Sequence, residues 1–274
     1  MSTKITAFGL RDATVIKLKE TDLYPEEATG TTPFWGQDIA GINSLQPNVT
    51  PHQRVTALGD DRVVFTTVIP PNENINFTVT TAIRDMNFEA LISGVETATS
   101  AGDGILVAYD TDKRGDEPTV ALIFRREAQD TNPNSPTKGA TRWQQIIVPA
   151  AKVTPAGFTA SQQEAESNSY SVTPTPVTKT LWQQSLSDGT YGANETVYQV
   201  LVTEYPVWLD FYYLSSGTTG LQLSHQPISV AKTEVWSNGT KQSVSAVNTT
   251  SNTVTTSGSV NGSVVVVYQT TSIE

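Results

Sequence analysis

The residues that could do chemistry in this chain are few, and their spacing does not suit catalysis. The 274-residue sequence has no cysteine and two histidines, His52 and His225, both close to a proline. A zinc-binding helix needs histidines in a pattern such as H-x-x-x-H, and a serine nucleophile commonly stands in G-x-S-x-G. Neither motif occurs. We therefore expect surface or packing roles for both histidines, and we predict no catalytic residue.

One stretch of acidic residues resembles a metal site. Asp110, Asp112 and Gly115 match the start of a calcium loop. Arg114 and Ala121, however, occupy the fifth and twelfth positions, where oxygen ligands belong. The stretch is predicted to be a solvated turn.

Two other chemical patterns are incomplete. Glu164 and Glu166 form a carboxylate pair, but no pattern of aromatic residues marks a sugar-binding cleft around them. The run 258–262 contains two glycines but lacks the spacing, the lysine and the helix of a phosphate-binding loop. We predict that the protein is not an enzyme and that it binds no metal and no cofactor.

The net charge of the chain limits the classes of partner that it can bind. The formal net charge is −10, and only 16% of the residues are charged. An acidic surface repels nucleic-acid phosphate and anionic lipid. No apolar run approaches the ~20 residues of a membrane span, and the N-terminus lacks the pattern of a secretory signal. We expect a protein that is made in a cytoplasm, stays soluble there and does not insert into a membrane.

Short apolar or alternating runs between turn-forming residues indicate a mainly β protein. Strands are predicted at 13–18, 61–69, 75–80, 105–109, 119–124, 142–149, 169–174, 195–203 and 207–213. The runs 61–69 and 75–80 are expected to pair, because a proline- and asparagine-rich turn joins them. The runs 119–124 and 142–149 are expected to pair with each other and to lie in the middle of a sheet. Pro149 has no N–H to donate and is expected to end its strand.

One short α-helix is predicted at 86–93. Asp85 can cap its first N–H groups, and Gly94 can stop it. Because two to three turns are not stable alone, Phe88 and Leu91 are expected to pack on a sheet. The expected fold is a β-sandwich or partial barrel with one short flanking α-helix and a small C-terminal β appendage.

The segment 20–61 shows almost no periodicity and contains four prolines and four glycines. A loop of this length inside a compact domain is usually functional or is ordered by a partner. It carries Phe34 and Trp35, which a solvated loop would not favour. Two interpretations stay open: the pair packs on its own domain, or it anchors a neighbouring copy and makes Phe34 and Trp35 inter-subunit contacts.

The composition changes near Gln222. Beyond it Ser, Thr and Val dominate, and Lys232 and Lys241 balance Glu234 and Glu274, so all of the net negative charge lies in 1–222. Two dipeptides typical of hairpin turns, at 238–239 and 261–262, occur in the neutral part. We predict one β domain over 1–222 and a separable small β appendage over 223–274.

The order of these stretches resembles the major tail tube proteins of tailed bacteriophages. The resemblance covers roughly 1–215 and rests on four features: the opening run 8–15, the long segment before Asp61, the capped helix 85–94, and the passage from 142–149 to 170–174. No catalytic motif accompanies it. The part after 222 is similar to small β appendages of some members.

This resemblance implies a structural virion protein. It implies hexameric rings that stack into a hollow tail tube, made in the host cytoplasm and present in the virion, with tape measure, tail terminator and baseplate proteins as partners. An acidic conduit would let DNA pass to the host without specific binding. The alternative is a β-rich phage fibre or a carbohydrate-binding, adhesive module, for which Trp182, Tyr191 and Trp236 would be the exposed aromatic residues.

Overall fold

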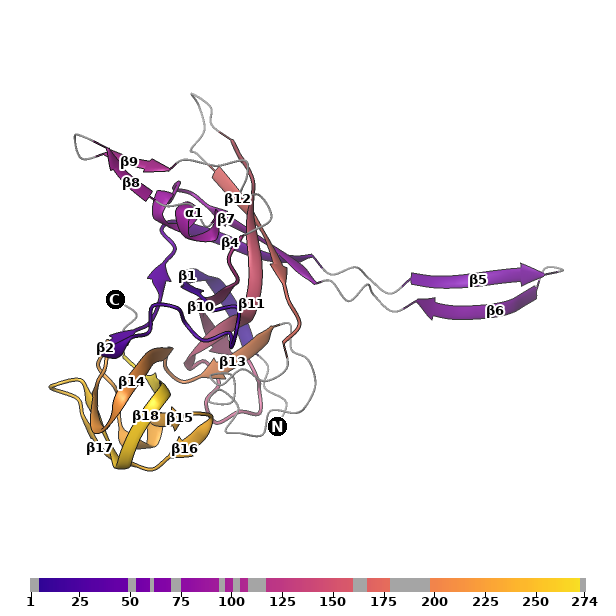
Figure 1. Cartoon of the computed structure of the whole chain (residues 1–274). Coiled ribbons are helices and arrows are strands. Elements are labelled where there is room, and N and C mark those ends of the chain that lie inside the picture. Colours follow the sequence, from indigo (N-terminus) through magenta and orange to yellow (C-terminus); the bar gives the residue numbers. More distant parts are fainter. Residues whose placement is uncertain are drawn as a thin grey trace.

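The computed structural model describes residues 5–48, 53–59, 62–69, 75–93, 97–100, 104–107, 117–159, 167–177 and 198–271 (Figure 1). Most of these residues lie in antiparallel strands, which form two larger sheets and two separate strand pairs. The expected mainly β class, with sandwich-like sheets and one short helix, is confirmed. Within the described residues, no helix is long and apolar enough to cross a membrane.

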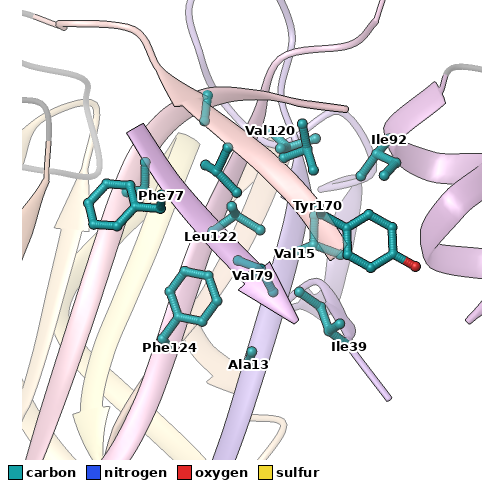
Figure 2. Close-up of a cluster of buried hydrophobic side chains, with 14 of the residues drawn as sticks. Ala13, Val15, Ile39, Phe77, Val79, Ile92, Val120, Leu122, Phe124 and Tyr170 are labelled. Carbon is teal, nitrogen blue, oxygen red and sulfur yellow. The ribbon is translucent and has the colours of Figure 1, made fainter. Parts of the chain in front are cut away.

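The larger sheet has eight strands and curls into a partial barrel. Its order is β3 (Gln37–Asp38), β1 (Ile5–Lys17), β10 (Val120–Asp130), β11 (Thr141–Thr159), β12 (Ser167–Pro174), β7 (Asn76–Thr81) and β4 (Ile42–Asn48), with β13 (Gln199–Thr203) added to β11. The curl brings β1 into contact with β4. Inside it lies the barrel core, shown in part in Figure 2, which includes Val15, Phe77, Val79, Leu122, Phe124, Val153, Tyr170 and Val172.

Pro149 does not end its strand, so that prediction is wrong. β11 continues through Pro149 to Thr159. Leu122 lies opposite Val148, whereas Val120 lies opposite Ala151, so β11 has one extra residue at this place. A β-bulge of this kind accommodates a proline, which cannot donate to the ladder. The expected pairing of 119–124 with 142–149 is confirmed.

The strands expected at 61–69 and 75–80 exist, but their predicted pairing is wrong. β6 (Arg62–Ile69) pairs with β5 (Gln53–Gly59), while β7 pairs with β4 and β12. Asn48 lies opposite Asn76, and Gln53 lies opposite Ile69. We call the two antiparallel pairs together the arm, with β4 and β7 as its base and β5 and β6 as its outer part. Two residues separate β5 from β6 and six separate β6 from β7, so β6 pairs with the strand that is nearer to it in sequence.

The segment 20–61 is consequently not a long irregular loop, which corrects that expectation. It contains β2 (Gly30–Phe34), β3, β4 and β5. β2, β3 and β4 pair with strands that are distant in sequence, whereas β5 pairs with the next strand, β6. The periodicity is weak because β2, β3 and β4 have few buried positions to mark it.

The helix α1 (Met86–Ser93) forms as expected. The Oδ1 atom of Asp85 accepts hydrogen bonds from the N–H groups of Asn87 and Phe88, both at 3.0 Å, which confirms the predicted cap. Phe88 is buried in the barrel core with its ring 5.0 Å from that of Tyr170, and Leu91 is partly buried beside it. Gly94 lies outside the described residues. A further strand pair, β8 (Thr97–Ser100) and β9 (Gly104–Val107), follows α1.

The second sheet has six strands. Its order is β16 (Thr240–Gln242), β15 (Thr233–Ser237), β18 (Thr253–Gln269), β14 (Val207–Gln222) and β2, with β17 (Val244–Asn248) added to β18 and the 3₁₀ turn Val230–Lys232 before β15. Asn238 and Gly239 have positive φ angles and connect β15 to β16, as predicted for a hairpin turn. Asn261 and Gly262 instead lie within β18, so the second predicted turn is wrong.

The second sheet begins before the predicted domain boundary. β14 ends at Gln222 and pairs from Val207 to Gln222 with β18, which belongs to the predicted appendage. β2, from the N-terminal part of the chain, pairs with the other edge of β14. The division into two domains stays a prediction, but the sheet changes before Val207 rather than after Gln222.

Two further cores lie on the two sides of this sheet. The middle core, between the sheets, joins Ile16, Ile123 and Ile147 of the larger sheet to Leu209, Phe211 and Val265 of the second. The outer core lies on the far side of the second sheet and includes Trp208, Tyr212, Leu221, Val254, Val264 and Tyr268. β1 is therefore buried on both faces, which explains why Thr14 is as buried as its apolar neighbours.

Candidate functional site

Phe34 and Trp35 contact their own chain. Phe34 is partly buried against the middle core, and Trp35 is partly buried against the outer core. The ring of Trp35 lies 5.5 Å from that of Trp208 and 5.8 Å from that of His225. These contacts agree with the interpretation that the pair packs on its own domain. The remaining exposure of both residues leaves the inter-subunit contact a prediction.

A buried ion pair lies where the two sheets meet. The guanidinium of Arg125 on β10 is 1% exposed and forms a salt bridge with Asp12 on β1. It also donates to Thr14 at 2.8 Å and to the carbonyl oxygen of Val207 at 3.2 Å, so it reaches from one sheet to the other. Burial lowers the pKa of Arg125, and Asp12 opposes that change. The neighbouring Asp38 has a raised pKa because it is partly desolvated and faces Asp12.

A second buried acid lies in the second sheet. Asp210 on β14 is fully buried and accepts hydrogen bonds from the hydroxyl and the N–H of Ser224 and from the hydroxyl of Tyr268. Burial raises the pKa of Asp210 to about 6, although these donors oppose the change. The signal in the sequence is an aspartate at a buried position of the apolar run 207–213.

Ser224, His225 and Asp210 are close together but do not form a catalytic triad. The Oγ atom of Ser224 lies 2.9 Å from Nδ1 of His225, yet the carboxylate of Asp210 binds the serine and not the histidine. In a triad the histidine lies between the other two and takes the serine proton. Here the serine hydroxyl is directed to the carboxylate. Burial and the nearby Arg125 lower the pKa of His225, which suits a packing role between aromatic rings.

Most of the other residues named from the sequence cannot be placed in the structure. His52, Asp110, Asp112, Glu164, Glu166, Trp182 and Tyr191 lie outside the described residues. Trp236, expected to be exposed in an adhesive module, is only 4% exposed. Among the residues that the structure describes, no group of three or more His, Asp or Glu could hold a metal ion.

The arm is the feature most suited to binding another molecule. Figure 1 shows β5 and β6 extending far from the two sheets. In the register, Val55 lies opposite Thr67 and Ala57 lies opposite Phe65. β5 and β6 contain apolar residue types such as Val55, Ala57 and Phe65. An isolated two-stranded ribbon is marginally stable in water, so its apolar residues favour contact with a partner.

No protein-family model matches the chain, and no curated protein matches it. A function for this chain is therefore inferred from its own sequence and geometry.

Proposed function

We propose that this chain is a structural virion protein whose copies form stacked hexameric rings, the tail tube of a bacteriophage. The observation that carries the proposal is the arm, whose outer strands β5 and β6 extend away from the two sheets (Figure 1). A subunit of a repeating assembly can place such a ribbon on the next copy.

The arm suits a contact between rings because its two parts have different surroundings. Its base, β4 and β7, belongs to the larger sheet and is fixed by β12 on one side. Its outer part, β5 and β6, pairs only within itself among the described residues. The base is fixed in the larger sheet, and the outer part would supply apolar residues such as Val55, Ala57 and Phe65 to a neighbouring copy.

The charge of the chain supports a conduit rather than a nucleic-acid-binding protein. The net charge of −10 denies DNA the counterion release that drives binding to basic surfaces. DNA would pass through such a tube without specific binding. Other tail proteins would contact the ends and the interior of the tube.

Electron microscopy of the purified protein tests the proposal. Tubes or rings with sixfold symmetry are the expected result. A variant in which residues 49–75 are replaced by Asn-Gly, so that Asn48 and Asn76 flank a two-residue hairpin turn, should keep the circular dichroism of the sheets and lose the tubes. Monodisperse monomers of the wild-type protein over a wide concentration range would overturn the proposal.

A matched pair of point variants refines this test. Phe65→Ser removes the aromatic residue of β6, and Thr66→Ser is a small change at the next residue of the same strand. The first should prevent elongation, and the second should leave tubes unchanged. Equal behaviour of the two variants would show that Phe65 does not hold the rings together.

A further inference from the structure

Several buried polar atoms gather at one margin of the middle core, around the guanidinium of Arg125. Within the described part of the chain, seven buried side-chain nitrogen or oxygen atoms have no hydrogen-bond partner in the protein. Five of them belong to residues that lie next to Arg125 or next to its contacts: both amide atoms of Gln145, Nε2 of Gln199, Nε1 of Trp208 and Oε1 of Gln269. We call these four residues, together with Arg125, the polar seam.

The larger sheet contributes two glutamines to the polar seam. Gln145 on β11 lies opposite Arg125 on β10, and Gln199 on β13 lies opposite Ile147 on β11. Directly opposed residues share one face of a sheet, and alternate residues of a strand share one face as well. Both glutamines therefore lie on the face of Ile147, which packs against the second sheet in the middle core. Gln145 is 1% exposed, so its amide has lost contact with bulk water.

The second sheet contributes Trp208 and Gln269. The ring of Trp208 covers the guanidinium of Arg125. Gln269 lies opposite Val207, whose carbonyl oxygen accepts a hydrogen bond from Nε of Arg125. Alternation along β18 puts Gln269 on the same face as Val265, which belongs to the middle core. The polar seam therefore has members on both sheets, and Arg125 touches the two sides.

The unpartnered groups of the polar seam require a molecule that both donates and accepts hydrogen bonds. The two sheets offer glutamine carbonyl oxygens as acceptors, and amide and indole N–H groups as donors. A carboxylate or a phosphate could bind only the donors, and Asp12, which already balances the charge of Arg125, would repel it. A metal ion could bind only the oxygen atoms. Water satisfies both kinds of group, and a buried water molecule typically makes about three hydrogen bonds.

We infer that the polar seam is a binding site for ordered internal water, which links the larger sheet to the second sheet through hydrogen bonds. The direct bonds of Arg125 join the sheets at one point. The water molecules extend this joint, because they connect the glutamines of the larger sheet to Gln269 and Trp208. The site is independent of the proposed assembly, because both sheets belong to one chain.

The variant Gln145→Met tests this site, because methionine has a similar length and no amide. If water fills the polar seam, the substitution removes two of its hydrogen-bond partners, and we expect the equilibrium constant for unfolding to rise by about 10-fold. If the polar seam is dry, the substitution removes two unsatisfied groups, and the constant should fall. Urea denaturation measures the constant, and an unchanged or lower value would overturn the inference.

Gln144→Met is the matched control on the same strand. Gln144 is partly exposed, and its Oε1 atom accepts a hydrogen bond from Arg126 on the opposite face of β11. We expect this variant to change the unfolding constant less than Gln145→Met does. An equal or larger change would show that the buried position of Gln145 has no special role, and it would count against the site.

A crystal structure of the wild-type subunit that resolves ordered water tests the site directly. We expect water within hydrogen-bonding distance of both amide atoms of Gln145 and of Gln269 or Trp208. A Gln145 amide that binds protein groups or faces only apolar side chains would overturn the inference, and so would water that contacts one sheet alone. This measurement needs no variant, so it decides the matter even if Gln145→Met does not fold.

Discussion

Arg125 and Trp208 come from different sheets, and the guanidinium carbon of Arg125 lies 3.8 Å from the centroid of the Trp208 ring. His225 also packs on this tryptophan, with its ring centroid 4.0 Å from that of Trp208. A buried cation that is paired with Asp12 and covered by an aromatic ring fixes how the two sheets meet.

Removing this cation should destabilise the protein strongly. Arg125→Met leaves the largely buried carboxylate of Asp12 without its partner, and we expect a loss of about 3–5 kcal/mol in the free energy of unfolding. Arg11→Met is the control, because Arg11 pairs with Glu127 at the surface, where an ion pair contributes about 0–1 kcal/mol. Urea denaturation of both variants measures the difference. Equal losses of unfolding free energy in the two variants would show that burial does not decide how much the Arg125 ion pair stabilises the protein.

The helix α1 should depend on Phe88 more than on Leu91. The sequence alone predicts similar losses of stability for Phe88→Ala and Leu91→Ala. In the structure, however, Phe88 is fully buried and Leu91 is partly exposed. We expect Phe88→Ala to cost about 3–5 kcal/mol and Leu91→Ala clearly less. Asp85→Ala should cost about 1 kcal/mol, and Asp85→Asn should recover most of it because asparagine also caps helices. Thermal melts would contradict this order if Leu91→Ala were the most damaging change.

The carboxyl of Asp210 should make stability fall as pH rises. Its folded pKa of about 6 lies above the ordinary 3.8, so the protonated form is favoured by folding. The contribution is fully present below pH about 4 and is lost as pH rises through 6, with a size on the order of 2–3 kcal/mol. Asp210→Asn should remove this slope.

The ionisation of His225 changes stability with pH in the opposite direction, so its effect must be separated from that of Asp210. Its lowered pKa contributes stability above its ordinary 6.5, and this is lost as pH falls below that value. The difference between wild type and Asp210→Asn, measured by urea denaturation from pH 4 to 8, isolates the carboxyl because both proteins keep His225. A constant difference across that range would contradict the prediction.

A chain that ends at residue 222 should not fold well. The composition of the sequence predicts that such a truncated chain is soluble and assembles. In the structure β18 pairs with β14 from Val207 to Gln222 and also supplies Val254, Val264 and Tyr268 to the outer core. Without β18 one edge of β14 and this apolar surface would be exposed, and we expect aggregation. A soluble truncated protein with the wild-type melting temperature would restore the boundary at 222.

Trp35→Ala tests whether this residue acts within or between subunits. Because the Trp35 ring packs on Trp208 and His225, the substitution should destabilise the free subunit by about 2–3 kcal/mol. Tyr213→Ala is the control, since that ring is 50% exposed. A variant with wild-type stability that no longer forms tubes would instead make Trp35 an inter-subunit contact.

The sequence by itself determined the local features of this protein. The alternation of apolar and polar residues predicted most strands. Successive side chains of a strand point to opposite faces, so the pattern can be read from neighbouring residues alone. The carboxylate of Asp85 and the apolar residues that follow it located the helix, because a cap and its helix are contiguous. The lack of cysteine and the isolated histidines argue against several kinds of chemical site, because such sites need particular residue types at particular spacings.

Only the tertiary structure decided which strands pair and which charged residues are buried. The partners of β7 and the pairing of β14 with β18 depend on contacts between distant parts of the chain, which local patterns do not encode. Arg125 and Asp210 look like surface residues in the sequence, but each lies on a strand face that another part of the chain covers.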